Sequence, residues 1–427
     1  MMKSSEIYRN NTNNEDMAKT IWIVNYYTSP SATASNPRYV ELAKHFMKAG
    51  YKVITFNALY DASLMPDEKG TFIEKHYGEE HFVHVRSPFY VGNGAKRIYS
   101  IFMFAWKLFR NAKRFPKPDL VLHNVHTPFD YPVLWAARRV GAKYIAEGWD
   151  LWPEDFETFG LIKKGSLPMK IAYWIEKHLY EKADQVIFTC EGIHDYLRGK
   201  GWLTEVGGRI PAEKVHYINN GINIQEFDEN VEKHPRSDED LNNDSIYKIV
   251  YLGSIRLVNN VKQLIDAAQL LRDNPKYRFL IYGDGNDRSM LEQYVKDNDI
   301  HNVVFKEKRI PLCEVAYVVR NATINIMNYQ KDFGLHGVSS GKMFQYMAAG
   351  KPICCNIKLN YSEISRNNLG IDEELETPEQ YADAIRKLAE QPQDEYEAMC
   401  MRVRKCAEKF DYNVLAAKEL EVIESLI

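Results

Sequence analysis

The chain has 427 residues and a net charge of −3, with 45% hydrophobic and 26% charged residues; this ordinary globular composition allows two or three domains and offers no global basic field for nucleic acid. Its six cysteines are scattered without a CxxC pair, which predicts neither a zinc site nor a disulfide framework and favours a reducing cytosol. No signal peptide is evident and no run approaches the ~20 apolar residues that span a bilayer, so we expect a soluble or peripheral protein.

The first half alternates short apolar strands with amphipathic helices. Residues 1–18 are polar and rich in asparagine, which predicts a disordered tail. The following strands are predicted in TIWIVNYYTSP, in YKVITFNA, and within residues 118–128, 142–150 and 183–192. Short apolar strands separated by helices predict a parallel sheet covered on both faces. We assign residues 19–228 to this first domain.

The second half repeats the pattern after a break. Residues 229–246 are charged and lack periodicity, which predicts a linker or exposed loop. Strands and helices then alternate again, so residues 247–410 form a second domain. A final helix, 411–427, is expected to brace one domain against the other. The predicted fold class is α/β, with two Rossmann-like doubly wound domains facing a cleft, and the cleft is the expected ligand site.

Residues 95–118 combine basic and aromatic side chains without any acid. Helical spacing predicts a buried stripe of Ile98, Ile101, Phe102, Ala105, Leu108, Phe109 and Ala112, with basic residues on the other side. Phe104 and Trp106 fall outside this stripe. The pattern is typical of an interfacial helix that binds anionic lipid headgroups. A helix that covers the first sheet with a solvated basic face would give the same pattern, and we expect both roles.

Two polar segments follow strands of the first domain. His126 comes just past the end of the strand predicted within residues 118–128, where an imidazole can orient or stabilise a reacting sugar or phosphate. The segment EGWDLWPED, residues 147–155, gathers carboxylates around two tryptophans. Such a set can bind a sugar, because carboxylates accept hydrogen bonds from its hydroxyls and indole rings contact its apolar face. A structural histidine and a capped surface loop are the alternatives.

Two glycine-containing loops follow strands of the second domain. Gly253 directly follows the apolar strand residues predicted within 247–255, and Arg256 lies three residues later. An arginine there suits a diphosphate, because its planar fork can donate two hydrogen bonds. A solvated loop arginine is the alternative. For Gly283 and Gly285 we rank a tight turn ahead of a ligand contact.

Residues 337–352, GVSSGKMFQYMAAGKP, place a lysine in the first turn of a helix. A cation is unfavourable at the positive end of a helix dipole, so an anion is expected nearby. Gly337, Ser339, Ser340 and Gly341 let backbone N–H groups approach a phosphate, and Lys342 adds a formal charge. A serine-capped structural helix with a solvated lysine is equally compatible with so short a motif.

Several segments together resemble a known family. DLWPED followed by residues 160–197, KVHYINNGINIQEF (214–227) and SSGKMFQYMAAGKPI (339–353) are similar to sequences of GT-B glycosyltransferases of the family 4 type, found in bacterial capsule and O-antigen assembly. The resemblance covers about residues 19–420. It implies that the second domain binds a nucleotide diphosphate sugar and the first domain binds the acceptor.

The resemblance also implies roles for individual residues. The catalytic set is His126, Asp150, Arg256 and Lys342. The donor-binding set is Gly253, Ser254, Arg256, Asn259, Gly283, Arg309, Ile310, Gly337, Val338, Ser339, Ser340, Gly341, Lys342 and Gln345. The acceptor-side set is Asn36, Arg38, Trp149 and Glu191.

The implied reaction retains the anomeric configuration and needs no cofactor or metal. UDP is favoured over GDP, and the acceptor is a lipid-linked saccharide in surface polysaccharide synthesis. We expect a cytoplasmic protein, peripheral at the inner membrane face through residues 95–118, without nucleic acid as a partner.

Many members of the family carry two glutamates around the helix predicted within residues 337–352. This sequence has Gly337 and Gln345 at those positions. The usual lysine after the Gly253–Arg256 loop is also absent, and Asn259 or Asn260 occupies that region. We interpret these changes as altered donor contacts. The alternatives are a nucleotide-sugar 2-epimerase of the same fold and a non-catalytic nucleotide-sugar-binding subunit.

Overall fold

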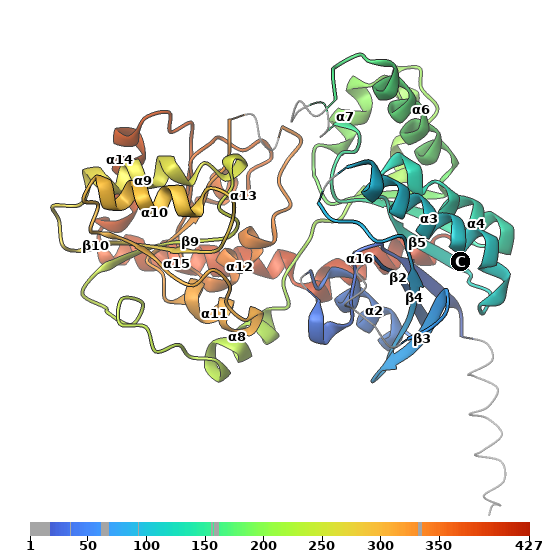
Figure 1. Ribbon diagram of the computed structural model, residues 1–427, viewed down its shortest axis with the longest axis horizontal. Coiled ribbons are helices and arrows are strands. Elements are labelled where there is room, and N and C mark those ends of the chain that lie inside the picture. Colours follow the sequence, from blue (N-terminus) through green and yellow to red (C-terminus); the bar gives the residue numbers. More distant parts are fainter. Residues whose placement is uncertain are drawn as a thin grey trace, which may run out of the picture. The chain divides into compact units, whose positions relative to one another are not determined.

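A computed structural model describes residues 18–34, 36–60, 68–92, 94–154, 157, 162–331 and 335–427. It divides the chain into two compact units, Met1–Asn219 with Ala416–Ile427, and Asn220–Leu415. Apart from Ala18, the predicted disordered tail lies outside the described residues. Each unit has its own sheet and its own core, and Figure 1 shows helices on both faces of the sheet in the second unit.

The first unit is built on a sheet with the strand order β3-β4-β2-β1-β5-β6-β7-β8. Its neighbours pair in parallel except β3 and β4, which are antiparallel. The strand residues are mostly apolar and buried on both faces, as a parallel sheet between helices requires. The strands are β1 Thr20–Val24, β2 Lys52–Leu59, β3 Phe72–Tyr77, β4 Glu80–Arg86, β5 Leu120–Asn124, β6 Lys143–Gly148, β7 Gln185–Phe188 and β8 Val215–Tyr217.

Helices of the first unit cover this sheet. One core cluster joins Trp22 and Phe56 of the sheet to Phe104 of the helix that follows β4. Phe104 is 1% exposed, so its predicted place outside the buried stripe is wrong, whereas Phe102 is at the surface. The helices are α2 Arg38–Lys48, α3 Ala95–Asn111, α4 Pro132–Val140, α6 Leu167–Lys182, α7 Ile193–Gly199 and most of α16 Tyr412–Glu424.

The second unit has the strand order β11-β10-β9-β12-β13-β14, with every described pair parallel. The order reverses between β9 and β12, where connections leave in opposite directions. Such a switch point places the loops after β9 and β12 beside each other at the carboxyl edge. The strands are β9 Tyr247–Leu252, β10 Tyr277–Tyr282, β11 Val303–Phe305, β12 Ile324–Met327, β13 Ile353–Cys355 and β14 Gly370–Asp372.

Helices form a layer on each side of the second sheet. Figure 1 shows α9, α10 and α14 on one side and α8, α11, α12 and α15 on the other. Alternate strand residues pack into the two layers, with Tyr251 in one core cluster and Val250 in another. The helices are α8 Ile224–Lys233, α9 Val261–Leu270, α10 Arg288–Asp297, α11 Leu312–Arg320, α12 Gly341–Ala349, α13 Glu363–Asn367, α14 Pro378–Ala389 and α15 Gln393–Ala407. The predicted class of two Rossmann-like α/β domains is confirmed.

The structure divides the chain earlier than the predicted boundary at residue 228. Helix α8 belongs to the second unit, where Phe227 joins a buried cluster. Leu241, inside the predicted linker 229–246, is fully buried against Val250 and Tyr282. The charged composition of residues 229–246 concealed the burial of Leu241. The bracing role of residues 411–427 stays a prediction.

Candidate functional site

Two glycines bring the loops after β9 and β10 into close contact. Gly253 has a φ of +156° and Gly283 a φ of +130°, a region that favours glycine. A Cβ on Gly283 would lie 1.8 Å from the carbonyl oxygen of Gly253. The backbone N–H of Gly253 in turn donates to the carbonyl of Tyr282 at 3.1 Å. Glycine is therefore required at both positions, which supports the structural interpretation of Gly283.

Lys342 lies against the first of these loops. A Cβ on Gly253 would be 2.2 Å from the Lys342 Nζ. The same Nζ lies 4.8 Å from the centre of the Tyr251 ring, and the Tyr251 hydroxyl donates to the carbonyl of Ser254 at 2.6 Å. The first helical turn of α12 and the end of β9 thus hold the amine at the carboxyl edge of the sheet.

Among the described residues, the Lys342 amine has no acidic neighbour. It forms no ion pair or hydrogen bond with any of them. Burial lowers its pKa from the usual 10.5 to about 8, because the charged form loses hydration there. An amine held in such a place gains stability from an anion, and α12 directs its free N–H groups to the same end.

The segment before α12 is shaped for an exposed backbone. Gly337 has a φ of +98°, a conformation that a glutamate adopts only with strain. Ser340 is the N-cap residue and its side chain caps no N–H group of the helix. Ser339 Oγ accepts a hydrogen bond from the Asn220 N–H at 3.3 Å, and its carbonyl accepts one from Asn220 Nδ2 at 3.2 Å. Ser339 therefore anchors the segment within the second unit.

Arg256 and Asn259 lie in the same loop and differ in their surroundings. Arg256 is exposed, and no described residue pairs with its guanidinium. It lies three residues after Gly253, which touches Lys342. Asn259 is buried and accepts a hydrogen bond from Ser254 Oγ at 2.7 Å. The geometry thus leaves Arg256 available for a ligand, whereas Ser254 and Asn259 stabilise the loop through each other.

The remaining donor-side residues surround this edge. Gln345 is half-buried on α12, one turn after Lys342, and Val338 and Ile310 are half-buried as well. Ile310 packs against two core clusters, so its side chain supports the loop at 308–311, while Arg309 is exposed. The structure thus gathers Gly253, Lys342 and the start of α12 directly, with Arg256 on the adjoining loop.

His126 lies at the carboxyl edge of the first unit's sheet, just after β5. Its Nε2 is 3.3 Å from Asn25 Oδ1, and its backbone N–H donates to Asp130 Oδ2 at 2.8 Å. The Tyr27 ring packs edge-on at 4.9 Å. Burial lowers the pKa of His126 to about 4 despite Asp130, so the imidazole is neutral at pH 7.

Trp149 and Asp150 follow β6 at the same edge. Trp149 stacks on Tyr39 with ring centres 5.3 Å apart, and its Nε1 is buried without a hydrogen-bond partner. Asp150 reaches solvent, yet desolvation by the surrounding protein raises the pKa of its carboxyl. Glu191, also predicted on the acceptor side, is half-buried after β7.

Arg38 does not fit its predicted acceptor-side role. Its side chain is 0% exposed. Nε donates to Glu147 Oε1 at 2.6 Å, and the other guanidinium nitrogens donate to the Asn219 carbonyl at 2.6 Å and Glu419 Oε2 at 3.1 Å. Arg38 is therefore a structural ion-pair residue. Asn36 is exposed and its Oδ1 accepts from the Arg38 N–H at 3.0 Å, which fixes the start of α2.

Sequence reasoning missed three residues that shape these edges: Tyr251 beneath Lys342, and Asn25 and Tyr27 beside His126. Asn25 Oδ1 also accepts the N–H groups of Tyr27 at 2.7 Å and Thr28 at 2.9 Å, so it orders the loop after β1. The signal was present in NYYTSP, because this polar turn directly follows a buried strand. Tyr251 is hidden within an apolar strand and gave no signal.

Two family models match the chain in tandem. Glycosyltransferase Family 4 matches residues 38–226, and Glycosyl transferases group 1 matches residues 234–409. The chain belongs to the GT-B glycosyltransferases of the family 4 type. Both halves of the predicted family resemblance are thereby confirmed.

Individual relatives of this family are distant. "Probable glycosyltransferase WbjE" of Pseudomonas aeruginosa is 24% identical over 65% of this chain and 66% of its own length, so the match spans just under two thirds of that relative. HepE of Anabaena in complex with UDP is 14% identical with a TM-score of 0.66, covering 95% of this chain and all of HepE. An E. coli trehalose-6-phosphate protein bound with UDP-2-fluoro glucose is 11% identical with a TM-score of 0.72, covering 96% and 99%. These structures share the fold.

Proposed function

We propose that this chain transfers a sugar from a nucleotide diphosphate sugar, with UDP favoured over GDP, to a lipid-linked saccharide in surface polysaccharide synthesis. The reaction retains the anomeric configuration and needs no metal ion. The observation that carries the proposal is the Lys342 amine, which is held beside Gly253 and the first turn of α12 with no described acid as its partner. A diphosphate supplies the missing negative charge.

The proposed chemistry is electrostatic stabilisation of the leaving diphosphate. Lys342, the exposed Arg256 and the N–H groups at the start of α12 bind its oxygens, where negative charge grows as the glycosidic bond to phosphate breaks. The neutral His126 accepts or donates a hydrogen bond at the sugar, and Asp150 and Trp149 contact acceptor hydroxyls and an apolar sugar face. HepE was crystallised with UDP and with UDP-glucose, which favours a UDP donor here.

Donor turnover tests the proposal. The purified protein is supplied with UDP- and GDP-sugars, with and without a lipid-linked saccharide, and released nucleotide and products are identified. We expect acceptor-dependent transfer, reduced at least 100-fold in Lys342→Ala and Arg256→Ala, and unchanged in Lys358→Ala, which removes an exposed lysine elsewhere in the second unit. Normal turnover in both site variants would overturn the proposal.

The two alternative functions give different products. Conversion of UDP-N-acetylhexosamine without any acceptor would identify a 2-epimerase. Nucleotide-sugar binding without transfer or hydrolysis of any donor would identify a non-catalytic subunit. Neither alternative accounts for an exposed aromatic and basic helix in the first unit.

That helix, α3, supports a second part of the proposal, which is attachment to an anionic inner-leaflet membrane surface in the cytoplasm. Phe102 and Trp106 stack with ring centres 6.0 Å apart, and Tyr99 is 55% exposed. Lys96 and Arg110 are exposed on the same helix. Aromatic side chains flanked by cations favour the headgroup region of anionic lipids.

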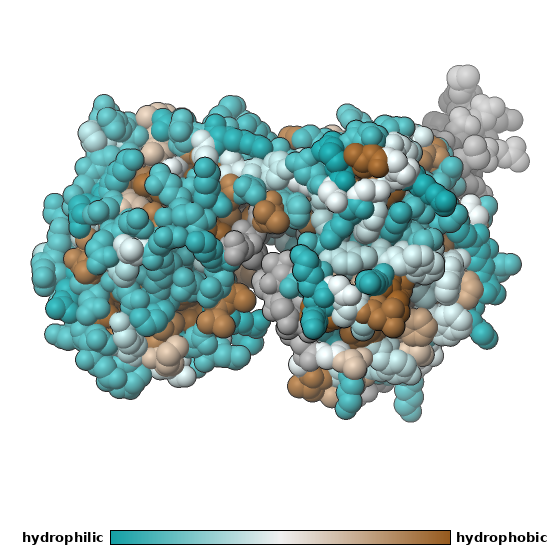
Figure 2. Space-filling view, turned by 90° about the horizontal axis from the view of Figure 1, so that it is seen from above, coloured by the Kyte–Doolittle hydropathy of each residue, from teal (hydrophilic) through white to brown (hydrophobic). Residues whose placement is uncertain are grey.

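The face of the molecule drawn in Figure 2 has hydrophobic patches within a mostly hydrophilic surface. Among the described helices, none combines the length and hydrophobicity that crossing a bilayer requires.

A further inference from the structure

The antiparallel hairpin of β3 and β4 brings two histidines and a glutamate to one face. His76 and His81 are directly opposite each other in the register, and Glu74 lies two residues before His76 on the same strand. Side chains two residues apart on a strand share a face, and directly opposed side chains have Cβ atoms about 4.5–5.5 Å apart. The three side chains therefore converge by the geometry of the hairpin itself.

The distances within this trio suit a metal ion. The His76 and His81 rings stack at 4.3 Å with an angle of 22°, and His81 Nε2 is 2.7 Å from Glu74 Oε1. One ligand atom from each residue lies within 4.8 Å of the others. Zinc binds such nitrogens and oxygens at about 2.0–2.2 Å, which separates tetrahedral ligands by roughly 3.4 Å. Small side-chain rotations would bring the trio to that spacing.

We propose that Glu74, His76 and His81 form a site for a divalent transition-metal ion of the Zn²⁺ class. A set of imidazole nitrogens and a carboxylate oxygen binds such ions in preference to Mg²⁺ or Ca²⁺. Three protein ligands leave a fourth position for water. Within the described part of the chain, this is the single group of three side chains with such spacing.

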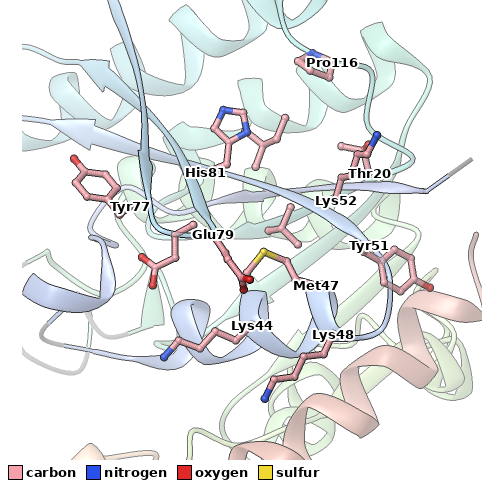
Figure 3. A pocket seen from close by; sticks show the side chains of 13 residues that line it. Thr20, Lys44, Met47, Lys48, Tyr51, Lys52, Tyr77, Glu79, His81 and Pro116 are labelled. Carbon is pink, nitrogen blue, oxygen red and sulfur yellow. The ribbon is translucent and has the colours of Figure 1, made fainter. Parts of the chain in front are cut away.

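The site lies at the amino edge of the first unit's sheet, since β4 begins at Glu80 and runs parallel to β2. His81 also lines an open pocket of about 880 Å³ whose other walls include α2. Figure 3 shows the His81 ring directed away from Lys44 and Lys48 of that helix. The ammonium groups therefore do not face the imidazole, and they would not face a cation bound to it.

A bound ion would crosslink β3, the edge strand of the sheet, to β4. It would replace the Glu74–His81 hydrogen bond by three coordinate bonds and would stabilise the folded first unit by linkage. The site is separate from the proposed donor site, because its residues belong to another unit and another sheet. Glycosyl transfer would not depend on it.

Zinc titration of the full chain without a histidine tag tests the proposal. We expect one Zn²⁺ per chain by calorimetry at pH 7.5, a raised melting temperature, and for Co²⁺ the absorption bands of a low-coordinate complex. His76→Ala and His81→Ala should weaken binding at least 30-fold and Glu74→Gln about tenfold. His301→Ala, which removes an exposed imidazole of the second unit, should leave binding unchanged.

Two results would overturn the proposal. One is the absence of stoichiometric zinc binding by the folded wild-type chain. The other is equal affinity in His81→Ala and His301→Ala, with circular dichroism showing both variants folded. UDP-sugar turnover is measured in the same variants to separate metal binding from the proposed enzyme function. Zinc binding can be absent while turnover is retained, and turnover can be absent while zinc binding is retained.

Discussion

The ammonium group of Lys342 occupies the space that any side chain at residue 253 would need, because a Cβ on Gly253 would lie 2.2 Å from Nζ. Two segments almost ninety residues apart in sequence are therefore shaped for each other. The loop after β9 supplies a backbone without a side chain, and α12 supplies the charge. This relationship makes the proposed diphosphate site specific enough to be tested by small substitutions.

A methyl group at residue 253 should displace the amine. Gly253→Ala is expected to weaken UDP binding at least tenfold, because the Cβ and Nζ cannot both keep their positions. Calorimetric titration with UDP measures the effect. Gly141→Ala is the matched control, since Gly141 also has a positive φ, +75°, but has open space around its Cβ. Equal UDP affinity in the two variants would contradict the proposed contact.

UDP binding should depend on pH through Lys342. Burial lowers the pKa of this amine to about 8, so the free protein loses the charge as pH rises through 8. Binding an anion favours the charged form and raises that pKa. The dissociation constant for UDP should therefore increase up to tenfold per pH unit above 8 and stay level below 7. In Lys342→Met this dependence should disappear; a parallel dependence in that variant would exclude Lys342 as its source.

His126 should affect turnover and spare donor binding. Burial holds the pKa of this imidazole at about 4, so its role is that of a neutral hydrogen-bonding group throughout pH 5–9. We expect His126→Ala to lower kcat about 100-fold or more, as for other lost acid–base or orienting groups, while UDP affinity changes less than twofold. Steady-state kinetics and titration together separate these effects. A loss confined to UDP affinity would refute the assigned role.

Glu419 should make the first unit less stable as pH rises. Burial and the neighbouring Glu147 raise its pKa to about 8, although Arg38 opposes the shift. A carboxyl whose folded pKa exceeds its unfolded value of 4.5 contributes stability below pH 4.5, and that contribution is lost between pH 4.5 and 8 at about 1.4 kcal/mol per pH unit. Glu419→Gln should flatten the profile and raise the melting temperature near pH 8.

The control for this prediction is Glu421→Gln, on the same helix and exposed, which should keep the wild-type slope. Arg38 retains Glu147 and the Asn219 carbonyl in Glu419→Gln, so no buried charge loses all its partners. Thermal unfolding between pH 5 and 8.5 measures the slopes. Identical slopes for wild type and Glu419→Gln would show that Glu419 does not titrate in this range.

Membrane attachment should depend on the stacked aromatic pair of α3, the exposed Phe102 and the half-buried Trp106. Phe102→Ser with Trp106→Ser should reduce binding to vesicles containing anionic lipid about tenfold or more at low salt. The two substitutions remove the apolar ring area that would enter the membrane interface and orient the helix there. Leu312→Ser, an exposed apolar residue of the second unit, should have no effect. Sedimentation with anionic and neutral vesicles measures this. Equal binding to neutral vesicles would contradict the electrostatic part of the proposal.

The sequence predicted the α/β fold and the family resemblance because their signals are local. Lys342 after a glycine-serine segment and Gly253 after a strand are recognisable from spacing alone, and the two family models confirm the resemblance. What the spacing did not reveal is that these two residues touch. Their contact depends on the order β9-β12 in the sheet, which is a long-range property.

The failures of prediction have the same origin. The family resemblance implied an acceptor-side role for Arg38, but its side chain is buried and paired with Glu147 and Glu419, more than a hundred residues away in sequence. Phe104 lay outside the helical stripe drawn from the sequence, yet its ring packs edge-on against Tyr26 in the core. The segment 229–246 lacked periodicity, but Leu241 packs into a buried cluster, and Asp238 and Asp240 pair with Lys306. In all three cases the burial of the residue depends on tertiary contacts with residues distant in sequence, which a local sequence pattern does not contain.

The most direct test of the central claim compares UDP with uridine as ligands of wild type and Lys342→Met in the same calorimetric experiment. If the amine and the N–H groups of α12 bind a diphosphate, wild type should prefer UDP to uridine by at least 100-fold, and the substitution should remove most of that preference while leaving uridine affinity unchanged. Equal affinity of wild type for UDP and uridine, or an undiminished preference in Lys342→Met, would contradict the account.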